Sequence, residues 1–327
     1  MLSRVANAIY WMNRYIERAE NYARFMDVNF NLSLELHPDL SEQWKPLVVT
    51  SGDWSGFEDQ FDKAEKREVI YFLGFDSTNP NSIYNSIINA RENARAIRPE
   101  ITKEVWEQIN YLYHFVKSGA DKKLWKKKDP RDFFLEIKKS CQLLYGILDS
   151  TISRTEGWHF GKIGQMIERA DKTSRVLDVK YHMLLPSVKS VGSTLDLVQW
   201  ASLLKSVSAY DMYRKKRGKL TPIHIAEFLI LDREFPRSIL TCLNQASHSI
   251  NTITGSGEGY SNEAEKLLGR MESGLGYTDI QDIFGTGLHE YLDQLQIQLN
   301  EISNAIFEEY FSMDKFSSQI QTSTSLQ

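Results

Sequence analysis

The amino-acid sequence predicts an all-α protein, a multi-helix bundle built from two duplicated halves that are related by a pseudo-two-fold axis. Apolar residues recur at spacings of three and four along most of the chain, which is the pattern of amphipathic helices, and no strong hairpin signal interrupts them. In addition, residues 16–28 return as residues 167–179, 151 positions later, with seven of the thirteen positions identical. An ordinary amphipathic helix repeats apolar character but not the order of individual charges, so we interpret this likeness as an internal duplication.

The likeness continues beyond this segment at a slightly larger offset of 156 positions. The matched pairs are Trp44 and Trp200, Phe72 and Phe228, Asp76 and Asp232, Pro80 and Pro236, and Ser82 and Ser238. A five-residue insertion near residues 185–194 explains the change of offset. We expect the repeats, about residues 1–150 and 151–311, to form a single domain, residues 1–311, because no Pro/Gly-rich linker separates them. Residues 312–327 lack periodicity, and we expect a disordered tail there.

The first half predicts a series of helices with recognisable ends. Ile9 and Ile16 belong to an apolar stripe along the first helix. Pro80 fits the first turn of a later helix because its missing N–H costs nothing there, and an Asn or Ser of residues 76–82 can cap that helix. A glycine-containing segment, residues 118–120, predicts a break. The expected helices span residues 3–34, 41–49, 57–75, 82–98, 101–117 and 133–153.

The second half follows a similar order after a junction at Gly157-Trp158. Asp76 and Asp232 occupy the two repeated turns, where a carboxylate can accept hydrogen bonds from backbone N–H groups. Residues 274–287 are rich in glycine and predict a loop. The expected helices span residues 160–184, 195–216, 222–232, 236–253, 263–273 and 288–311.

The repeated charges lie beside the buried face of the two matching helices. At about 100° per residue, one sector next to the apolar stripe contains Glu17, Glu20, Arg24 and Asp27. The equivalent residues of the second copy are Glu168, Asp171, Arg175 and Asp178. Arg18 and Arg169 point about 100° away from the glutamates that precede them, and neighbours in a helix do not face each other. Each member of a Glu-Arg dipeptide is therefore expected to pair with another helix.

Two interpretations of these charges are open. The first is a structural network of ion pairs, because buried charges are tolerated only when they are paired. In it, Glu20 pairs with Arg24 one turn later. Glu17 or Asp27 would meet Arg91, Arg95 or Arg98 of a neighbouring helix.

The second interpretation is a polar cavity where the two Glu-Arg helices cross. Carboxylates and arginines in such a cavity could bind a peptide, an amino acid or another carboxylate ligand. The candidate ligand-binding residues are Glu17, Arg18, Glu20, Arg24, Glu168, Arg169, Asp171 and Arg175.

No metal or cofactor site is predicted. Glu156 and His159 match the Glu-x-x-His pattern of carboxylate-bridged metal bundles, but the first half has Ala8 in the equivalent place. His224 and Glu227 are equally isolated. The sequence also lacks a nucleophile elbow, a phosphate-binding glycine loop and a telling Cys-His pair.

The composition is typical of a soluble globular protein, with 42% hydrophobic and 25% charged residues. A net charge of −4 gives no reason to expect nucleic acid or a membrane as a partner. Cys141 and Cys242 lie in apolar helical patterns and predict buried free thiols in a reducing compartment. The first twenty residues lack the apolar core of a signal peptide, and no apolar run is long enough for a membrane span, so we expect a cytoplasmic location.

The combination of these motifs resembles the alpha-E family, an all-helical bacterial family named for its Glu-Arg motif. The resemblance rests on residues 2–6 and 10–21, residues 79–82 and 90–95, residues 156–158 and 167–171, and residues 226–232. It extends over about residues 1–311.

The family resemblance implies partners rather than a known activity. Alpha-E proteins are associated with circularly permuted ATP-grasp ligases and with transglutaminase-like peptidases, which implies a role in making or modifying peptide-like amide bonds. One hypothesis is a partner or substrate-presenting subunit that binds a peptide or carboxylate ligand at the Glu/Arg-lined seam. The alternative is an autonomous enzyme in which Glu17 and Glu168 perform acid–base chemistry on an amide or amine, with Arg18 and Arg169 orienting carboxylates.

Overall fold

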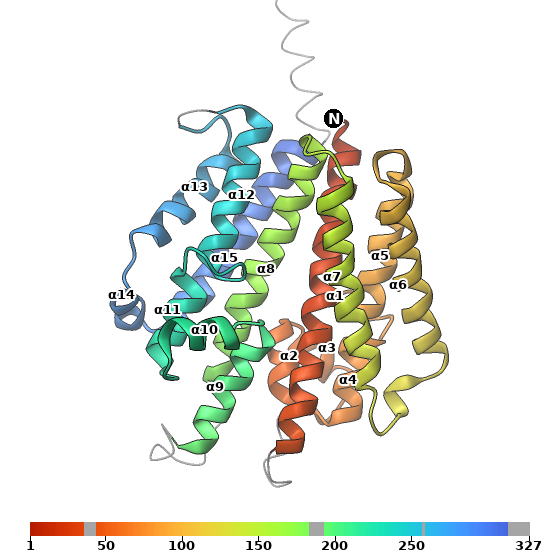
Figure 1. Cartoon of the computed structure of the whole chain (residues 1–327), viewed down its shortest axis with the longest axis vertical. Helices are drawn as coiled ribbons and strands as arrows, with labels where there is room; N and C mark the ends of the chain where they lie inside the picture. The colour runs from red at the N-terminus through yellow and green to blue at the C-terminus, as the bar shows by residue number, and fades with distance from the viewer. Residues whose placement is uncertain (36–43, 183–192, 257–258, 313–327) are drawn as a thin grey trace, which may run out of the picture.

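The computed structural model describes residues 1–35, 44–182, 193–256 and 259–312, and it contains only helices and their connections in these ranges (Figure 1). The all-α prediction is confirmed. The expected insertion near residues 185–194 falls almost wholly on residues outside the described part of the chain. The same holds for all but the first residue of the expected tail and for the start of the helix expected at residues 41–49.

Two long helices, α1 (Ser3–Glu35) and α8 (Glu156–His182), lie side by side at the centre of the bundle (Figure 1). On one side, α5 (Ile83–Ala96) and α7 (Arg131–Thr151) pack against α1, and α6 (Lys103–Asp121) covers both from outside. On the other side, α12 (Ile239–Thr254) and α15 (Leu288–Ile306) pack against α8, and α13 (Glu263–Gly276) covers them. Each central helix therefore has its own set of three outer helices.

Shorter elements fill the ends of this arrangement. In the first half they are α2 (Lys45–Ser51), α3 (Trp54–Glu58), α4 (Lys66–Gly74) and the 3-10 turns η2 (Arg98–Glu100) and η3 (Leu124–Lys126). In the second half they are α9 (Thr194–Ser206), α10 (Tyr210–Arg217), α11 (Pro222–Leu231), α14 (Ile280–Thr286) and the π turn η5 (Phe307–Phe311). Contacts cross between the halves, because α2 packs against α8 and α9 packs against α1.

The contact between α1 and α8 is unusually close at two glycines of α8. A Cβ atom on Gly164 would overlap the backbone carbonyl oxygen of Tyr10, and one on Gly161 would lie 2.7 Å from the Asn13 side-chain nitrogen. Only residues without a side chain allow this approach. Gly161 and Gly164 thus set the distance between the two central helices.

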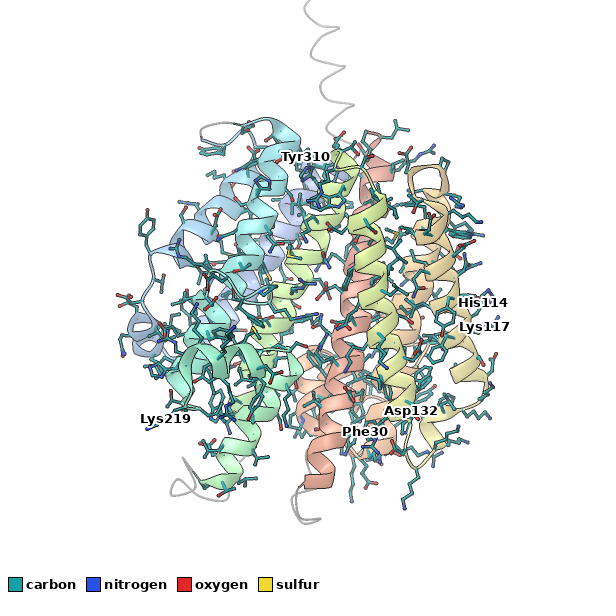
Figure 2. All side chains as sticks on the ribbon, viewed as in Figure 1. Phe30, His114, Lys117, Asp132, Lys219 and Tyr310 are labelled. Atoms are coloured by element: carbon teal, nitrogen blue, oxygen red, sulfur yellow. The ribbon has the colours of Figure 1, made fainter. Side chains whose placement is uncertain are left out.

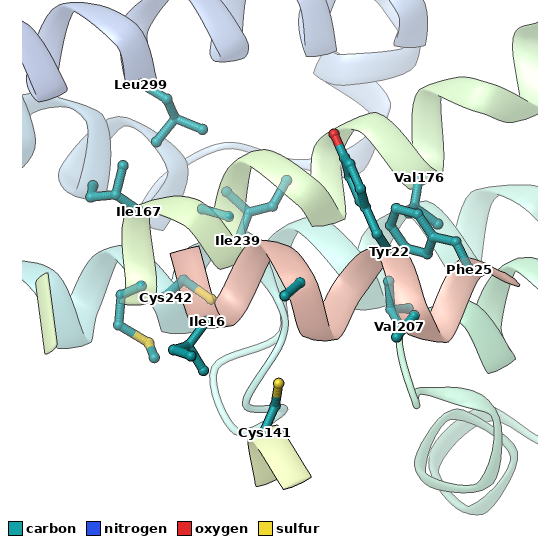
Figure 3. Packing of buried hydrophobic residues seen from close by; sticks show 14 of the residues in the cluster. Ile16, Tyr22, Phe25, Cys141, Ile167, Val176, Val207, Ile239, Cys242 and Leu299 are labelled. Atoms are coloured by element: carbon teal, nitrogen blue, oxygen red, sulfur yellow. The ribbon is translucent and has the colours of Figure 1, made fainter. Parts of the chain in front are cut away.

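Buried side chains from both halves meet around the central pair. Ile16 of α1 and Ile167 of α8 belong to a single hydrophobic cluster with Cys141, Ile239 and Leu299 from α7, α12 and α15 (Figure 3). The outer surface carries polar side chains, such as those of His114 and Lys117, which are exposed on α6. Phe30, by contrast, is buried near the C-terminal end of α1 (Figure 2).

The repeated turns contain the predicted serine caps, but Pro80 lies in the turn before α5 and not in the first turn of that helix. Ser82 and Ser238 cap α5 and α12 by accepting hydrogen bonds from the third residue of each helix. The Asp76 carboxylate accepts from the backbone N–H of Thr78 at 2.8 Å, and the Asp232 carboxylate accepts from that of Phe235 at 2.8 Å. The turn and cap chemistry expected for both aspartates is confirmed.

Some expected helix boundaries were wrong. The helix expected at residues 57–75 is two helices, α3 and α4. The one expected at 195–216 breaks between α9 and α10, where Ser208 has a positive φ of 54°. Conversely, residues 118–120 do not break α6, because Gly119 is buried there and leaves room for the ring of Phe133. The glycine-rich segment at residues 274–287 contains α14.

Candidate functional site

The two Glu-Arg dipeptides exchange partners across the contact between α1 and α8. The Glu17 carboxylate accepts hydrogen bonds from Arg169 Nε and Nη2, at 2.9 and 2.8 Å. In the reverse direction, the Glu168 carboxylate accepts from Arg18 Nε and Nη2, at 2.6 and 3.0 Å. Both contacts are bidentate, which is the strong and geometrically specific form of an Arg–carboxylate pair. The expectation that each Glu and Arg pairs with another helix is confirmed.

Further cations surround the first carboxylate. Arg237 donates from Nη1 to Glu17 at 3.0 Å and from Nη2 to Glu20 at 2.7 Å. The amide of Asn21 also donates to Glu17, at 3.0 Å. Glu17 is fully buried, so this set of donors replaces water around its charge.

The second carboxylate has an equivalent environment from different residues. Arg14 donates from Nε to Glu168 at 2.9 Å, and the Lys172 ammonium lies 3.7 Å from the same carboxylate. Arg18 also donates to the Asn81 side chain at 2.6 Å. Like Glu17, Glu168 is fully buried.

The remaining candidate residues form pairs along their own helices. Glu20 pairs with Arg24 one turn later in α1, as expected, and Asp171 pairs with Arg175 at 3.0 Å in α8. Arg24 also donates to the Ser208 hydroxyl in the break between α9 and α10. All eight candidate residues therefore take part in ion pairs that are buried or largely buried, in one cluster around Glu17 and a second around Glu168. We call the two clusters together the Glu-Arg network.

The cations of the network keep its carboxylates ionised. Burial by itself raises the pKa of the Glu17 carboxyl, but Arg169 and Arg237 hold that pKa well below its usual range. The same balance applies to Glu168, where Arg18, Lys172 and Arg14 hold the pKa far below normal against the effect of burial. On Arg24, burial together with the charge of Arg237 lowers the pKa to about 9.

The eight candidate residues all form ion pairs, but some of their partners differ from those predicted from the sequence. Arg91, Arg95 and Arg98 do not meet Glu17, because they bind groups of α5, α6 and the turn between them. Asp27 pairs with Lys138 of α7 at 2.5 Å instead. The sequence does point to two of the unpredicted partners, Asn81 and Arg237, because they occupy the same place in the two repeated turns.

A cavity of about 360 Å³ opens next to the Glu-Arg network, between the first turns of α1 and α8 and the last turns of α7. We call it the Arg169 cavity, because Arg169 lines it while binding Glu17. Gln165, whose amide donates to Glu17 at 3.4 Å, lines it as well, as do Lys162, Tyr145 and Gly146. The other wall is apolar and includes Met12, Ile152 and Trp158.

Two groups at this cavity have fewer partners than buried polar groups usually have. Within the described ranges, the Tyr145 hydroxyl interacts with the Glu17 carboxylate, but outside normal hydrogen-bond geometry. Burial and the nearby Glu17 charge raise the pKa of Tyr145 far above normal, so the hydroxyl keeps its proton and can donate it. Lys162 is largely buried, and burial together with Arg169 lowers its pKa. Neutral or anionic polar groups of a ligand would satisfy both.

Neither a metal centre nor a membrane span emerges from the part of the chain that the structure describes. No group of three or more His, Cys, Asp or Glu side chains is placed there to hold a metal ion. None of its helices combines the length and apolar character needed to cross a bilayer.

Comparison with known proteins adds a family to this geometry. A family model named Alpha-E, described as a predicted alpha-helical domain with a conserved ER motif, matches residues 1–311. The chain belongs to the Alpha-E family. The resemblance noted from the sequence is thereby confirmed. In this member of the family, the two Glu-Arg dipeptides, ER in one-letter code, bind each other across the central helix pair.

The relatives found among curated proteins are longer than this chain. Uncharacterized proteins of Mycobacterium bovis and of two strains of Mycobacterium tuberculosis are 23% identical over 320 residues. The match covers 89% of this Alpha-E chain but 34% of each relative, so the chain spans about a third of their length. No solved structure matches significantly.

Proposed function

We propose that this Alpha-E protein is a binding subunit that holds a peptide- or carboxylate-bearing ligand in the Arg169 cavity for a partner that makes or modifies amide bonds. The observation that carries the proposal is the place of Arg169. It belongs to the Glu-Arg network and also lines a cavity. Its fixed guanidinium, with Lys162 and the Tyr145 hydroxyl, gives a ligand carboxylate or amide several donors.

The other seven candidate residues have a supporting role in this proposal. Glu17 fixes the orientation of Arg169 through two hydrogen bonds, and the reciprocal pair of Glu168 with Arg18 fixes α8 against α1. Glu20, Arg24, Asp171 and Arg175 extend the network away from the cavity. A binding site held in this way is pre-organised, which reduces the entropy that ligand binding must overcome.

The proposed partners are a circularly permuted ATP-grasp ligase and a transglutaminase-like protein. Two facts support a partner of some kind. The family resemblance implies these enzymes, and the mycobacterial relatives carry about two thirds of their length outside the matched region. We place the system in the cytoplasm, which the two buried free thiols of the described chain favour.

The geometry gives little support to the alternative of an autonomous enzyme that uses Glu17 and Glu168. A general base works best when its pKa lies near the operating pH. Both carboxylates have pKa values far below that range, and both are fully buried behind bidentate arginines. Acid–base chemistry would require these pairs to break first.

We also infer that residues 1–311 are one domain of two duplicated halves related by a pseudo-two-fold axis. The reciprocal pairs Glu17–Arg169 and Glu168–Arg18 support this inference, as do the reciprocal contacts of α2 with α8 and of α9 with α1. Asn81 and Arg237 support it further, because Asn81 contacts the Arg18–Glu168 pair and Arg237 contacts the Arg169–Glu17 pair.

Co-purification from the native cell tests the proposed function. The full chain, tagged at its C-terminus, is expected to retain an ATP-grasp or transglutaminase-like protein and a small ligand. A Gly146→Trp variant should fill the Arg169 cavity, because Gly146 lines it and a Cβ atom there meets nothing within 4 Å. It should lose the ligand but keep the partner.

Gly269→Trp is the matched control, since Gly269 on α13 also faces open space and does not line this cavity. It should keep both. A wild-type protein that carries neither partner nor ligand would contradict the proposal. So would a Gly146→Trp variant that retains the same ligand as the wild type.

A further inference from the structure

A second cavity lies beside the first, between the end of α7, the first turns of α8 and the face of α12. Its volume is about 760 Å³, and we call it the His159 cavity. It shares Asp149, Trp158 and Lys162 with the Arg169 cavity, so Lys162 stands between the two. The rest of the lining differs and comes from residues with polar side chains, although their apolar atoms supply most of the surface of the cavity. It consists of Arg154, His159, Arg233, Thr241, Asn244, Gln245, His248, Ser249 and Thr252.

The lining of the His159 cavity carries an excess of positive charge. Arg154, Lys162 and Arg233 face a single carboxylate, that of Asp149, which leaves two positive charges without a counter-charge in the lining. Asp149 binds Arg154 at 3.0 Å, but both side chains are 62% exposed, and such a surface pair contributes little and rearranges easily. The cavity therefore has the charge to balance a dianion.

Several of these cations have donors to spare. Within the described residues, Lys162 has no carboxylate within ion-pair distance, although its side chain is largely buried and burial with Arg169 lowers its pKa. One amino group of Arg233 donates to the Gly276 carbonyl oxygen at 2.9 Å, which fixes the guanidinium at the rim. The remaining N–H groups of a guanidinium can bind two oxygens of one anion.

Two histidines complete the lining. His159 is only 7% exposed, and its Nδ1 atom has no hydrogen-bond partner among the described residues, which is unusual for a buried polar atom. Its ring centroid lies 6.4 Å from that of His248 on α12. Burial, with His248 and Arg154, lowers the pKa of His159, so the ring is neutral at pH 7 and can donate one N–H.

We propose that the His159 cavity binds the phosphate group of a small phosphate monoester. A phosphate monoester is a dianion near pH 7, whereas a carboxylate supplies one charge and two acceptor oxygens in one plane. The donors of the lining come from three elements, α8, α12 and the turn after α11, so they can be shared among the three terminal oxygens of a phosphate. The cavity is larger than inorganic phosphate requires, so it leaves space for the rest of an ester.

This site shares Lys162 with the proposed carboxylate site in the Arg169 cavity, but each site also has residues of its own. Arg233 and His248 line only the His159 cavity, whereas Tyr145 and Gln165 line only the Arg169 cavity. Variants of one pair therefore test one site without altering the other.

Histidine NMR on the full chain tests the phosphate site directly. The chain has seven histidines, and the ring signals of His159 and His248 can be assigned by substitution. Phenyl phosphate, inorganic phosphate and acetate would be titrated at constant ionic strength and pH 7.5. Phenyl phosphate should shift both signals saturably and raise the pKa of His159, because a dianion stabilises the imidazolium. Inorganic phosphate should shift them more weakly, and acetate should not.

Two variants complete the test. Arg233→Gln should weaken phenyl phosphate binding about tenfold or more, since it removes a charge-assisted contact. Arg95→Gln is the control, because Arg95 is an exposed arginine on the opposite half of the bundle. This variant should bind phenyl phosphate as tightly as the wild type does. The proposal is overturned if phenyl phosphate causes no saturable shift, if acetate shifts the signals equally, or if Arg233→Gln binds as tightly as the wild type.

Discussion

Replacing Glu17 by Gln should destabilise the protein strongly, although the two side chains have nearly the same size. The change removes the counter-charge of Arg169 and one of the two carboxylates that Arg237 binds, in a place with no access to water. Breaking one partner of a buried ion pair typically costs about 3–5 kcal/mol, because the other charge stays buried. We expect a loss of about 4 kcal/mol, a large part of the roughly 5–15 kcal/mol that stabilises a typical domain.

Urea unfolding followed by tryptophan fluorescence measures this loss. The midpoint should fall without a change in the slope m, and the melting temperature should drop by about 8 °C or more. Glu92→Gln is the matched control. Glu92 also binds two arginines, Arg91 and Arg95, but its side chain is 42% exposed, so the expected cost is below about 0.5 kcal/mol. If Glu17→Gln costs no more than Glu92→Gln, the Glu-Arg network does not stabilise the fold and our reasoning fails.

Three further predictions concern the central helices α1 and α8 and the buried residues packed around them. The unfolding free energy of the wild type should fall as the pH drops below roughly 4.3, the pKa of an unfolded glutamate. The folded pKa of Glu17 lies lower, so its contribution is present above that pH and lost below it, and Glu17→Gln should show a flatter acid limb. Gly164→Ala should cost about 3 kcal/mol or more in urea unfolding, because the new Cβ overlaps backbone of α1. Gly269 is a helical glycine that faces open space, so Gly269→Ala should be neutral or stabilising by about 0.5–1 kcal/mol. If the two alanine variants have equal unfolding free energies, α1 does not approach α8 closely at Gly164. Cys141 and Cys242 should not react with a thiol reagent until the chain unfolds, because both are buried and burial raises the pKa of Cys242 to about 12. Rapid labelling of the native protein would contradict their placement.

The sequence predicted the helical class and the inter-helix role of the Glu-Arg dipeptides because both follow from local periodicity. Glu17 and Arg18 point in different directions on one helix, so each had to find a partner elsewhere. The identity of those partners depends on which helices touch, and periodicity does not encode that. The predicted partners of Glu17 on a neighbouring helix, Arg91, Arg95 or Arg98, therefore differ from Arg169, which contacts it in the structure.

Local breaks were also difficult to predict. Ser208 adopts a positive φ within a sequence that reads as continuous helix, and Arg24 binds its hydroxyl. Gly119 reads as a helix breaker, yet it stays helical because the Phe133 ring occupies the space where a side chain would lie. In both cases tertiary contacts override local propensity. The two cavities likewise depend on three-dimensional packing, so no sequence pattern marked Tyr145 or His159 as short of hydrogen-bond partners.

The exchange of partners between α1 and α8 also has a consequence for the order of folding during synthesis. The contacts of Glu17 with Arg169 and of Arg18 with Glu168 join residues about 150 positions apart. While a ribosome is still producing the first half, α1 carries charges that have no partner and an apolar face that α8 will later cover. Closing so long a loop is entropically slow. The nascent first half must therefore stay partly open until α8 has left the ribosome, and the central contact is completed late.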